Sequence, residues 1–160
     1  MLTTALKVAK SFLPTENHKK TPPQTCIPVK MKRQWTHFSC TAAVLQMVAH
    51  HYGIKMGHIE AITLTGCTMD GAALTAIADV LKESGLKTRH VTSSGVRRAL
   101  QRGQPVISHD AVSYQSDHAI LVIGQTPKGF WIADPLVAEM RWEKEARFLQ
   151  MSEEWIAVKE

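Results

Sequence analysis

The sequence lacks any apolar run long enough to cross a bilayer. A spanning helix needs about 20 apolar residues, and the longest uninterrupted run here is Ala119 to Ile123. An export signal is lacking too, because Lys7 and Lys10 fall inside the segment that would have to form its hydrophobic core. These two absences predict residence in the cytoplasm, either free or at the periphery of a membrane.

Cysteine is scarce, and its pattern predicts no covalent framework. The three cysteines, Cys26, Cys40 and Cys67, are odd in number and do not have the paired spacing of metal ligands. We therefore expect neither a disulfide scaffold nor a zinc cluster. Internal repeats and low-complexity tracts are absent as well. A chain of 160 residues with 44% hydrophobic residues is then expected to bury an ordinary core.

Acidic residues are nearly absent from the first part of the chain. Residues 1–33 hold seven Lys and Arg and only one acid, Glu16, whereas residues 34–160 hold twelve Lys and Arg and thirteen acids. A nucleic-acid-binding domain is expected to carry its basic, aromatic surface on the folded body. Since the body is close to neutral, we predict no nucleic-acid partner.

The basic N-terminal part is predicted to be a helix and a linker. Residues 2–13 place apolar side chains on one helical face, and Pro14 ends the pattern. We favour docking of this helix on its own domain, and the alternative is contact with a membrane surface or a transporter. The expected organisation is a basic amphipathic helix and linker over residues 1–27, followed by one domain over residues 28–160.

Helical patterns come first in that domain and strand patterns come later. The first expected helix begins at Cys40 and ends near Gly53, the second covers Met56–Leu64, and the third covers Asp70–Ser84 with Asp70 as the N-cap. A short fourth helix, capped by Ser93 or Ser94, is expected to end near Gly103. Expected strands cover Pro105–Ser108, His118–Gly124, Gly129–Ala133, Glu139–Trp142 and Trp155–Val158. Segregation of this kind predicts an α+β domain in which N-terminal helices pack on a C-terminal antiparallel sheet.

Cys40 is placed where a helix would activate it. A thiol attacks as its thiolate, and the N–H groups and dipole of a helix N-terminus lower the thiol pKa. His118 opens one predicted strand and Asp134 ends the next, so a hairpin between them makes the two residues neighbours. A thiol, an imidazole and a carboxylate in this arrangement are the groups needed for nucleophilic acyl transfer.

Gln34 adds a fourth group six residues before Cys40. When a thiolate attacks a carbonyl, negative charge develops on the carbonyl oxygen, and an amide N–H can stabilise it by about 3 kcal/mol. The loop from Gln34 to Ser39 is therefore expected to present an amide and a sulfur to one substrate carbonyl.

The ordered set of motifs resembles family thirty-nine of the cysteine peptidases. The segments are Gln34 with Cys40, "AAVLQMVAHHYGI", "GAALTAIADVLKESGLKTR", "GQPVISH", "HAILVIG", "ADP" around Asp134, and "FLQMSEEWIAV". The resemblance covers about residues 28–158. Its members are papain-like domains that cut leader peptides after a double glycine, often as the N-terminal part of bacteriocin-exporting transporters. The resemblance implies a papain-like fold with Cys40 as nucleophile, His118 as base, Asp134 as its orienting carboxylate and Gln34 as oxyanion donor.

Two departures from the family pattern bear on the substrate. The family commonly has an acidic residue, then Cys, then Gly, whereas this chain has Ser39, Cys40 and Thr41. The β-branched Thr41 is expected to narrow or reshape the cleft. No transporter domains follow in this chain, so we expect cleavage without the usual physical coupling to export.

Three functions remain open on these residues. The first is a stand-alone thiol peptidase acting on a peptide or protein, with cleavage of a leader after small residues. The second is a glutamine deamidase or a transglutaminase-like effector or toxin, which would use the same triad to act on another protein. The third is a non-catalytic peptide-docking module. None of the three calls for a cofactor or a metal.

The other candidate residues have less support. His109 is a second candidate base, but its only evident carboxylate neighbour is Asp110 beside it. Cys26 and Cys67 are interpreted as structural. Adjacent His50 and His51 cannot share a helical face, and with His58 they are interpreted as surface or capping groups rather than metal ligands.

Overall fold

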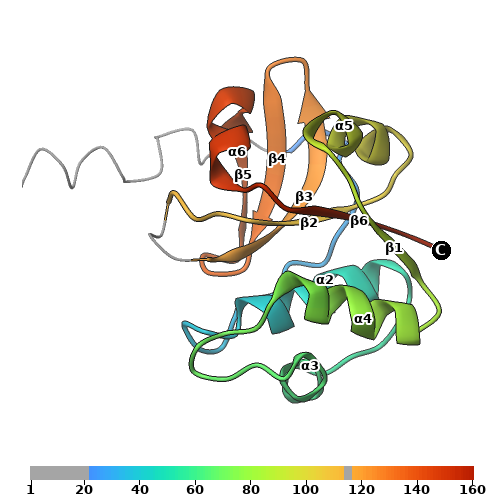
Figure 1. Ribbon diagram of the computed structural model, residues 1–160. Helices are drawn as coiled ribbons and strands as arrows, with labels where there is room; N and C mark the ends of the chain where they lie inside the picture. The colour runs from blue at the N-terminus through green and yellow to red at the C-terminus, as the bar shows by residue number, and fades with distance from the viewer. Residues whose placement is uncertain (1–21, 114–116) are drawn as a thin grey trace, which may run out of the picture.

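The computed structural model describes residues 22–113 and 117–160 and shows a helical layer against an antiparallel sheet (Figure 1). The helices are α2 (Cys40–His51), α3 (His58–Thr65), α4 (Leu74–Glu83), α5 (Ser93–Gln101) and α6 (Glu145–Met151). The strands are β1 (Lys87–His90), β2 (Val106–His109), β3 (Ala119–Thr126), β4 (Gly129–Asp134), β5 (Glu139–Lys144) and β6 (Trp155–Lys159). The α+β class predicted from the sequence is confirmed.

One six-stranded sheet organises the domain, with the strand order β1-β6-β2-β3-β4-β5 and antiparallel pairing throughout. Helices α2, α3 and α4 lie together below the sheet in Figure 1, and α5 and α6 lie beside its upper part. Helix α2 packs against α3, α4 and β3. The domain therefore has a helical lobe (α2, α3 and α4) and a sheet lobe (the six strands with α5 and α6). Cys40 belongs to the helical lobe, and His118 and Asp134 belong to the sheet lobe.

Helix α2 is the central helix of the core. All its residues from Cys40 to Ala49 are buried, and Ala42 to Leu45 are completely so. Alanine provides helix propensity without bulk, which lets the helix approach its neighbours closely. A helix that is apolar on every side must be surrounded by protein, and this explains why the nucleophile candidate at its first residue is held in a fixed place.

The structure corrects the expected start of the third helix. The sequence pattern placed its N-cap at Asp70, but α4 begins at Leu74 with Ala73 as N-cap. Gly71 has a left-handed φ of 83°, and its backbone forms a bridge with Thr68. A residue in that conformation cannot continue a right-handed helix, so residues 68–71 form a turn instead.

Three smaller differences have similar local causes. Thr92, rather than Ser93 or Ser94, caps α5, because its side chain accepts a hydrogen bond from the Gly95 N–H group. Strand β1 was not expected, since its residues are mostly exposed and polar and it pairs only with β6 at the sheet edge. Helix α6 was missed too, because it is only one or two turns long.

The hairpin of β3 and β4 decides how the candidate residues meet. Thr126 pairs with Gly129, and a register shift between Val122 and Gly124 changes the pairing further along. Leu121 then lies opposite Ala133. Continuing this register staggers His118 and Asp134 by two residues. The sequence predicted only that the two residues are neighbours, either directly opposite or staggered by a few residues.

The chain before α2 packs along the sheet. The Ile27 N–H donates to the Ile123 carbonyl oxygen at 2.7 Å, and Ile27 is buried. The helix expected over residues 2–13 lies outside the described residues. In residues 22–113 and 117–160, no helix combines the length and apolar character needed to span a membrane.

Candidate active site

The His118 ring and the Asp134 carboxylate form a buried hydrogen-bonded pair. His118 Nε2 lies 2.8 Å from Asp134 Oδ1, and the two side chains are 6% and 0% exposed. His118 stands just before β3 and Asp134 ends β4, so adjacent strands of the sheet bring the two residues together. With Nε2 engaged by the carboxylate, Nδ1 is the nitrogen left for a partner on the other side of the ring.

The Cys40 thiol is also hydrogen bonded to the His118 ring. Burial raises the pKa of the Cys40 thiol, but hydrogen bonds from His118 and from the Ala119 and Thr41 backbone, together with the His118 charge, bring that pKa below its ordinary value. Burial lowers the pKa of His118, but its hydrogen bonds to Asp134 and Cys40 raise it to about 9. Both directions favour a thiolate beside an imidazolium.

The Asp134 carboxylate is held from two further directions. Its Oδ1 also accepts the Leu136 N–H at 3.0 Å, and its Oδ2 lies 3.4 Å from Arg141 Nε. Sequence reasoning missed Arg141, because an arginine between Met140 and Trp142 in a strand gives no sign of which face it occupies. Only its register on β5, opposite Ile132 on β4, reveals that it is buried.

Gln34 lies in the loop before α2 and is buried. Its Nε2 donates to the Thr36 carbonyl oxygen at 2.8 Å, and its Oε1 has no hydrogen-bond partner within the described part of the chain. The Gln34 N–H donates to the Pro135 carbonyl oxygen at 3.0 Å, which ties this loop to the residue after Asp134. The amide keeps a second Nε2 hydrogen, which is the one that an oxyanion would need.

Ser39 fixes the shape of the loop that carries Gln34. Its Oγ accepts the Trp35 and Thr36 N–H groups at 3.1 and 3.0 Å and lies 3.4 Å from His58 Nε2. The His58 ring is stacked on Trp35, with the ring centroids 4.6 Å apart. His58 was expected at the surface and is instead buried, because its Nδ1 bonds to the buried Gln46 side chain at 2.7 Å.

A cleft of about 420 Å³ opens beside Cys40. It is lined by Cys40, residues 70–74, His109, Asp117 and Glu154. His109 reaches this cleft without joining the Cys40–His118–Asp134 chain, and burial lowers its pKa. Thr41, expected to narrow the cleft, is buried and is not among the lining residues.

The remaining cysteines and histidines make structural contacts. Cys26 and Cys67 are free thiols, and Cys67 Sγ donates to the Phe38 carbonyl oxygen at 3.0 Å. His50 Nε2 lies 3.1 Å from the Met56 carbonyl oxygen, and His51 Nδ1 lies 2.9 Å from that of Pro28. Over residues 22–113 and 117–160, no three His, Cys, Asp or Glu side chains gather in a way that could hold a metal ion.

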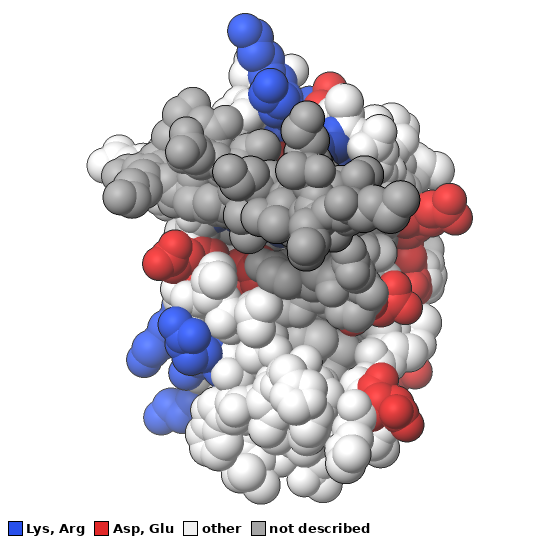
Figure 2. All heavy atoms as spheres, turned by 90° about the vertical axis from the view of Figure 1, so that its left-hand side faces the viewer, with Lys and Arg blue, Asp and Glu red and all other residues white. Residues whose placement is uncertain are grey.

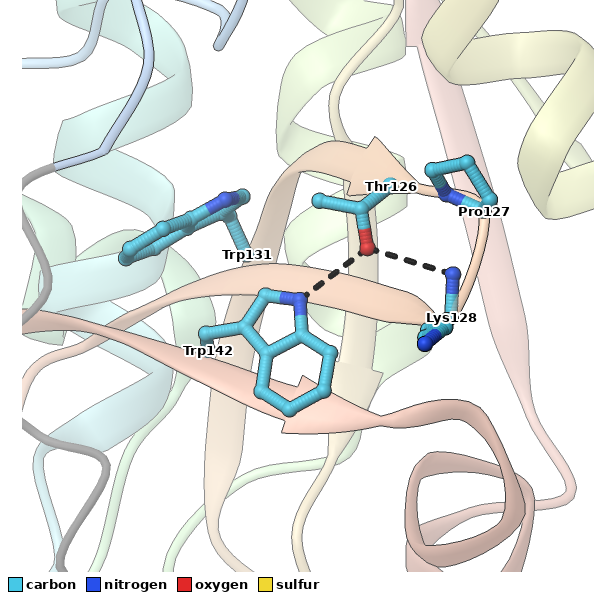
Figure 3. Close-up of a pocket in the computed structure, with 5 residues that line it drawn as sticks. All are labelled: Thr126, Pro127, Lys128, Trp131 and Trp142. Carbon is cyan, nitrogen blue, oxygen red and sulfur yellow. Dashed lines mark hydrogen bonds between the residues drawn. The ribbon is translucent and has the colours of Figure 1, made fainter.

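A second pocket lies at the other end of the β3–β4 hairpin (Figure 3). Its volume is about 330 Å³, and Trp131 and Trp142 form its apolar wall. Trp142 Nε1 donates to Thr126 Oγ1 at 3.2 Å, as the dashed line in Figure 3 shows. His118 and Asp134 stand at the opposite ends of the same two strands, so this pocket is separate from the Cys40 cleft.

Comparison with known proteins gives one family. Residues 28–158 match the model of the Peptidase C39 family. No curated protein matches the sequence.

Solved structures share the fold at low sequence identity. A double glycine motif protease from an AMS/PCAT transporter, solved in complex with the leader peptide, is 16% identical, with 84% of this chain and 92% of that chain covered and a TM-score of 0.68. The peptidase domain of Streptococcus ComA, a bifunctional ABC transporter involved in a quorum sensing pathway, is 22% identical, with 81% and 96% covered and a TM-score of 0.67. A C39-like peptidase from Bacillus anthracis is 15% identical, with 86% and 96% covered and a TM-score of 0.65.

Proposed function

The chain belongs to the peptidase C39 family and is a cysteine peptidase, and on this premise we propose that Cys40, His118 and Asp134 are its catalytic triad. The single observation that carries the proposal is the hydrogen-bonded chain from the Cys40 thiol through the His118 ring to the buried Asp134 carboxylate. Gln34 is proposed as an oxyanion donor, together with the Cys40 N–H group, since the first N–H groups of a helix have no partner within the helix.

The proposed reaction proceeds in two steps. The Cys40 thiolate attacks the peptide carbonyl carbon, and the His118 imidazolium gives its proton to the leaving amine as the C–N bond breaks. Water then attacks the thioester, with neutral His118 accepting one of its protons, and the Cys40 sulfur leaves. Asp134 keeps Nε2 of the ring protonated throughout, so that Nδ1 faces the reacting atoms.

We propose a peptide substrate that is cut after small residues, as in a leader peptide. The cleft beside Cys40 is lined in part by Gly71, Ala72 and Ala73, whose small side chains leave space for a peptide next to the thiol. A solved family neighbour of 16% identity is a double glycine motif protease that was crystallised with its leader peptide.

A surface of the helical lobe that carries few charges supports a peptide partner. On the face shown in Figure 2, the lower part, over the helical lobe, is largely free of Lys, Arg, Asp and Glu side chains. Trp35, Ile59 and Met69 of this lobe are 65%, 63% and 82% exposed. Apolar side chains that lie together at a surface are typical of sites that bind other chains, whereas single exposed ones are common on any protein.

Mass spectrometry of peptides incubated with the protein tests the proposal. We expect a 20-residue peptide with Gly-Gly at its centre to be cut after the second glycine, and the matched peptide with Leu-Leu there to remain intact. Cys40→Ala should abolish cutting, whereas Cys26→Ala should not. A mass gain of about 1 Da at a glutamine of an uncut peptide would instead identify a deamidase. Binding of the peptide without any reaction by wild type would identify a docking module.

A further inference from the structure

Arg141 lies at the centre of a buried charge cluster behind the proposed triad. It is 2% exposed, and its guanidinium contacts three carboxylates. Its Nε lies 3.4 Å from Asp134 Oδ2, its Nη1 lies 2.9 Å from Glu143 Oε2, and its Nη2 bonds to Asp110 Oδ2. All three carboxylate side chains are buried, so this one cation compensates charges that solvent does not reach.

The cluster behind His118 holds more carboxylates than guanidiniums. Among the described residues that face it, the cluster holds the carboxylates of Asp110, Asp134 and Glu143 and the guanidiniums of Arg141 and Arg147. Arg147 reaches Glu143 alone, with its Nε 3.4 Å from Glu143 Oε2. Three negative charges against two positive ones leave an excess of one negative charge on the side of the His118 ring where Asp134 lies, and this excess favours the imidazolium.

Arg141 also connects the two backbone segments that present the imidazole and the carboxylate. Asp110, which Arg141 binds, donates its backbone N–H to the His118 carbonyl oxygen at 2.7 Å. Arg141 also contacts Asp134 Oδ2. The other oxygen of that carboxylate, Oδ1, accepts hydrogen bonds from His118 Nε2 and from the Leu136 N–H group. One planar guanidinium therefore restrains both members of the His118–Asp134 pair.

We propose that Arg141 is a positioning residue of the peptidase reaction, which keeps Asp134 ionised and oriented toward His118 without touching the substrate. This inference rests on the proposed triad. Without the guanidinium, Asp134 would share a buried space with two other carboxylates and one remaining arginine. Like charges in such a space favour uptake of a proton. A protonated Asp134 would no longer stabilise the imidazolium, and the Cys40 thiolate would lose its partner.

Lysine should replace Arg141 only in part. A guanidinium offers five N–H groups in a rigid plane and can bind several carboxylates at once, whereas an ammonium is a single point charge on a flexible stem. Arg141→Lys therefore keeps the charge and loses the geometry, and Arg141→Gln loses both. The two variants separate the contribution of charge from that of orientation.

The rate of Cys40 alkylation by iodoacetamide, measured from pH 5 to 9 with peptide mass spectrometry, tests the inference. We expect Arg141→Gln to react about tenfold more slowly than wild type at pH 6, where only about a tenth of Asp134 would be ionised. At pH 8 most of Asp134 would be ionised again, so the rate should lie within about threefold of wild type. The alkylation rate of Arg141→Lys at pH 6 should lie between the rates of wild type and Arg141→Gln. If Arg141→Gln does not fold, as judged by circular dichroism, Arg141→Lys decides the test by its rate at pH 6.

A double variant distinguishes positioning from a general loss of structure. In an Asp134→Asn background the carboxylate that Arg141 holds toward His118 is absent, so Arg141→Gln should change the rate by less than about twofold. Arg97 offers a matched control, since it is also partly buried and bonds a carboxylate, with its Nη2 3.0 Å from Glu145 Oε1. Arg97→Gln is expected to leave the pH profile of Cys40 alkylation unchanged.

The outcomes separate this inference from the proposed function. If wild-type Cys40 reacts no faster than Cys26 and Cys67, the triad fails and the role of Arg141 fails with it. If wild-type Cys40 reacts rapidly but the folded Arg141 variants share its pH profile, the positioning role alone is overturned. The same holds if Arg141→Gln slows the reaction equally in the wild-type and Asp134→Asn backgrounds.

Discussion

Asp134→Asn removes one buried negative charge from the His118 ring while keeping the size of the side chain. Burial alone would lower the pKa of His118, but its hydrogen bonds to Asp134 and Cys40 raise that pKa to about 9. The ordinary histidine pKa is about 6.5, so the increase corresponds to roughly 3 kcal/mol in favour of the imidazolium. Asparagine supplies no charge to oppose the burial, and we expect the pKa to return to about 6.5 or lower.

The change in pKa sets the size of the expected effect at pH 7.5. A ring with a pKa of about 9 is roughly 97% protonated at that pH, and one with a pKa of about 6.5 is roughly 9% protonated. The direction of the effect follows from the raised pKa, which keeps His118 protonated at neutral pH. When Asp134 is replaced and the pKa falls, most of the rings are neutral at that pH. The thiolate of Cys40 depends on that imidazolium, so the alkylation rate should fall by about tenfold or more.

The assay is iodoacetamide alkylation at pH 7.5, with the labelled cysteine identified by peptide mass spectrometry. Asp79→Asn is the matched control, because Asp79 is exposed and contacts only Lys82 at 3.2 Å among the described residues. Its alkylation rate at Cys40 should equal that of wild type. A folded Asp134→Asn protein that reacts at the wild-type rate would refute the assignment of Asp134 as the group that charges His118.

Four further predictions follow from single contacts. Peptidase activity should rise with pH as the Cys40 thiol ionises below its ordinary pKa and should fall as His118 loses its proton near pH 9; a profile that keeps rising above pH 10 would contradict this pair. Gln34→Ala should lower kcat by about 10²- to 10³-fold and leave Cys40 alkylation unchanged, because an oxyanion donor acts only on the substrate. Gly129→Ala should cost about 1–3 kcal/mol in thermal unfolding, since a Cβ there would overlap the carbonyl oxygen of the paired strand, whereas Gly57→Ala, with nothing within 4 Å, should leave the midpoint nearly unchanged. Ala138→Gly should raise stability by up to about 1 kcal/mol or leave it unchanged, because Ala138 has a φ of 55° that glycine adopts without strain.

Local patterns in the sequence were sufficient for most of the elements that hold the candidate site. The alanine-rich run after Cys40 predicted α2 and its start, and the strand patterns at His118 and Asp134 predicted β3 and β4. These elements are long, apolar and bounded by turns, so local interactions and burial favour the same structure. The start of α4 was predicted incorrectly, because helical spacing does not reveal that Gly71 adopts a left-handed φ.

The order of the motifs also indicated the family and the chemical groups that a thiol mechanism needs. The order of residue types along the chain can be seen in the sequence alone. The order of Cys40, His118 and Asp134 indicated a peptidase family, and the comparison shows that the chain belongs to it. The distances between those groups cannot be seen in the sequence alone. A hairpin predicts neighbours, but the register shift between Val122 and Gly124 sets the actual stagger of His118 and Asp134.

The tertiary structure alone decided which charged groups are buried together. Asp110, Arg141 and Glu143 look like ordinary surface residues in the sequence, since charged side chains usually face solvent. Strand alternation places Arg141 and Glu143 on one face of β5, but only the packing of α6 against β4 and β5 covers that face. The sequence by itself therefore determined most of the elements, their order and the candidate reacting groups. Burial and the balance of charge around His118 arise from segments that are distant in the chain, and so they were decided only when the sheet assembled.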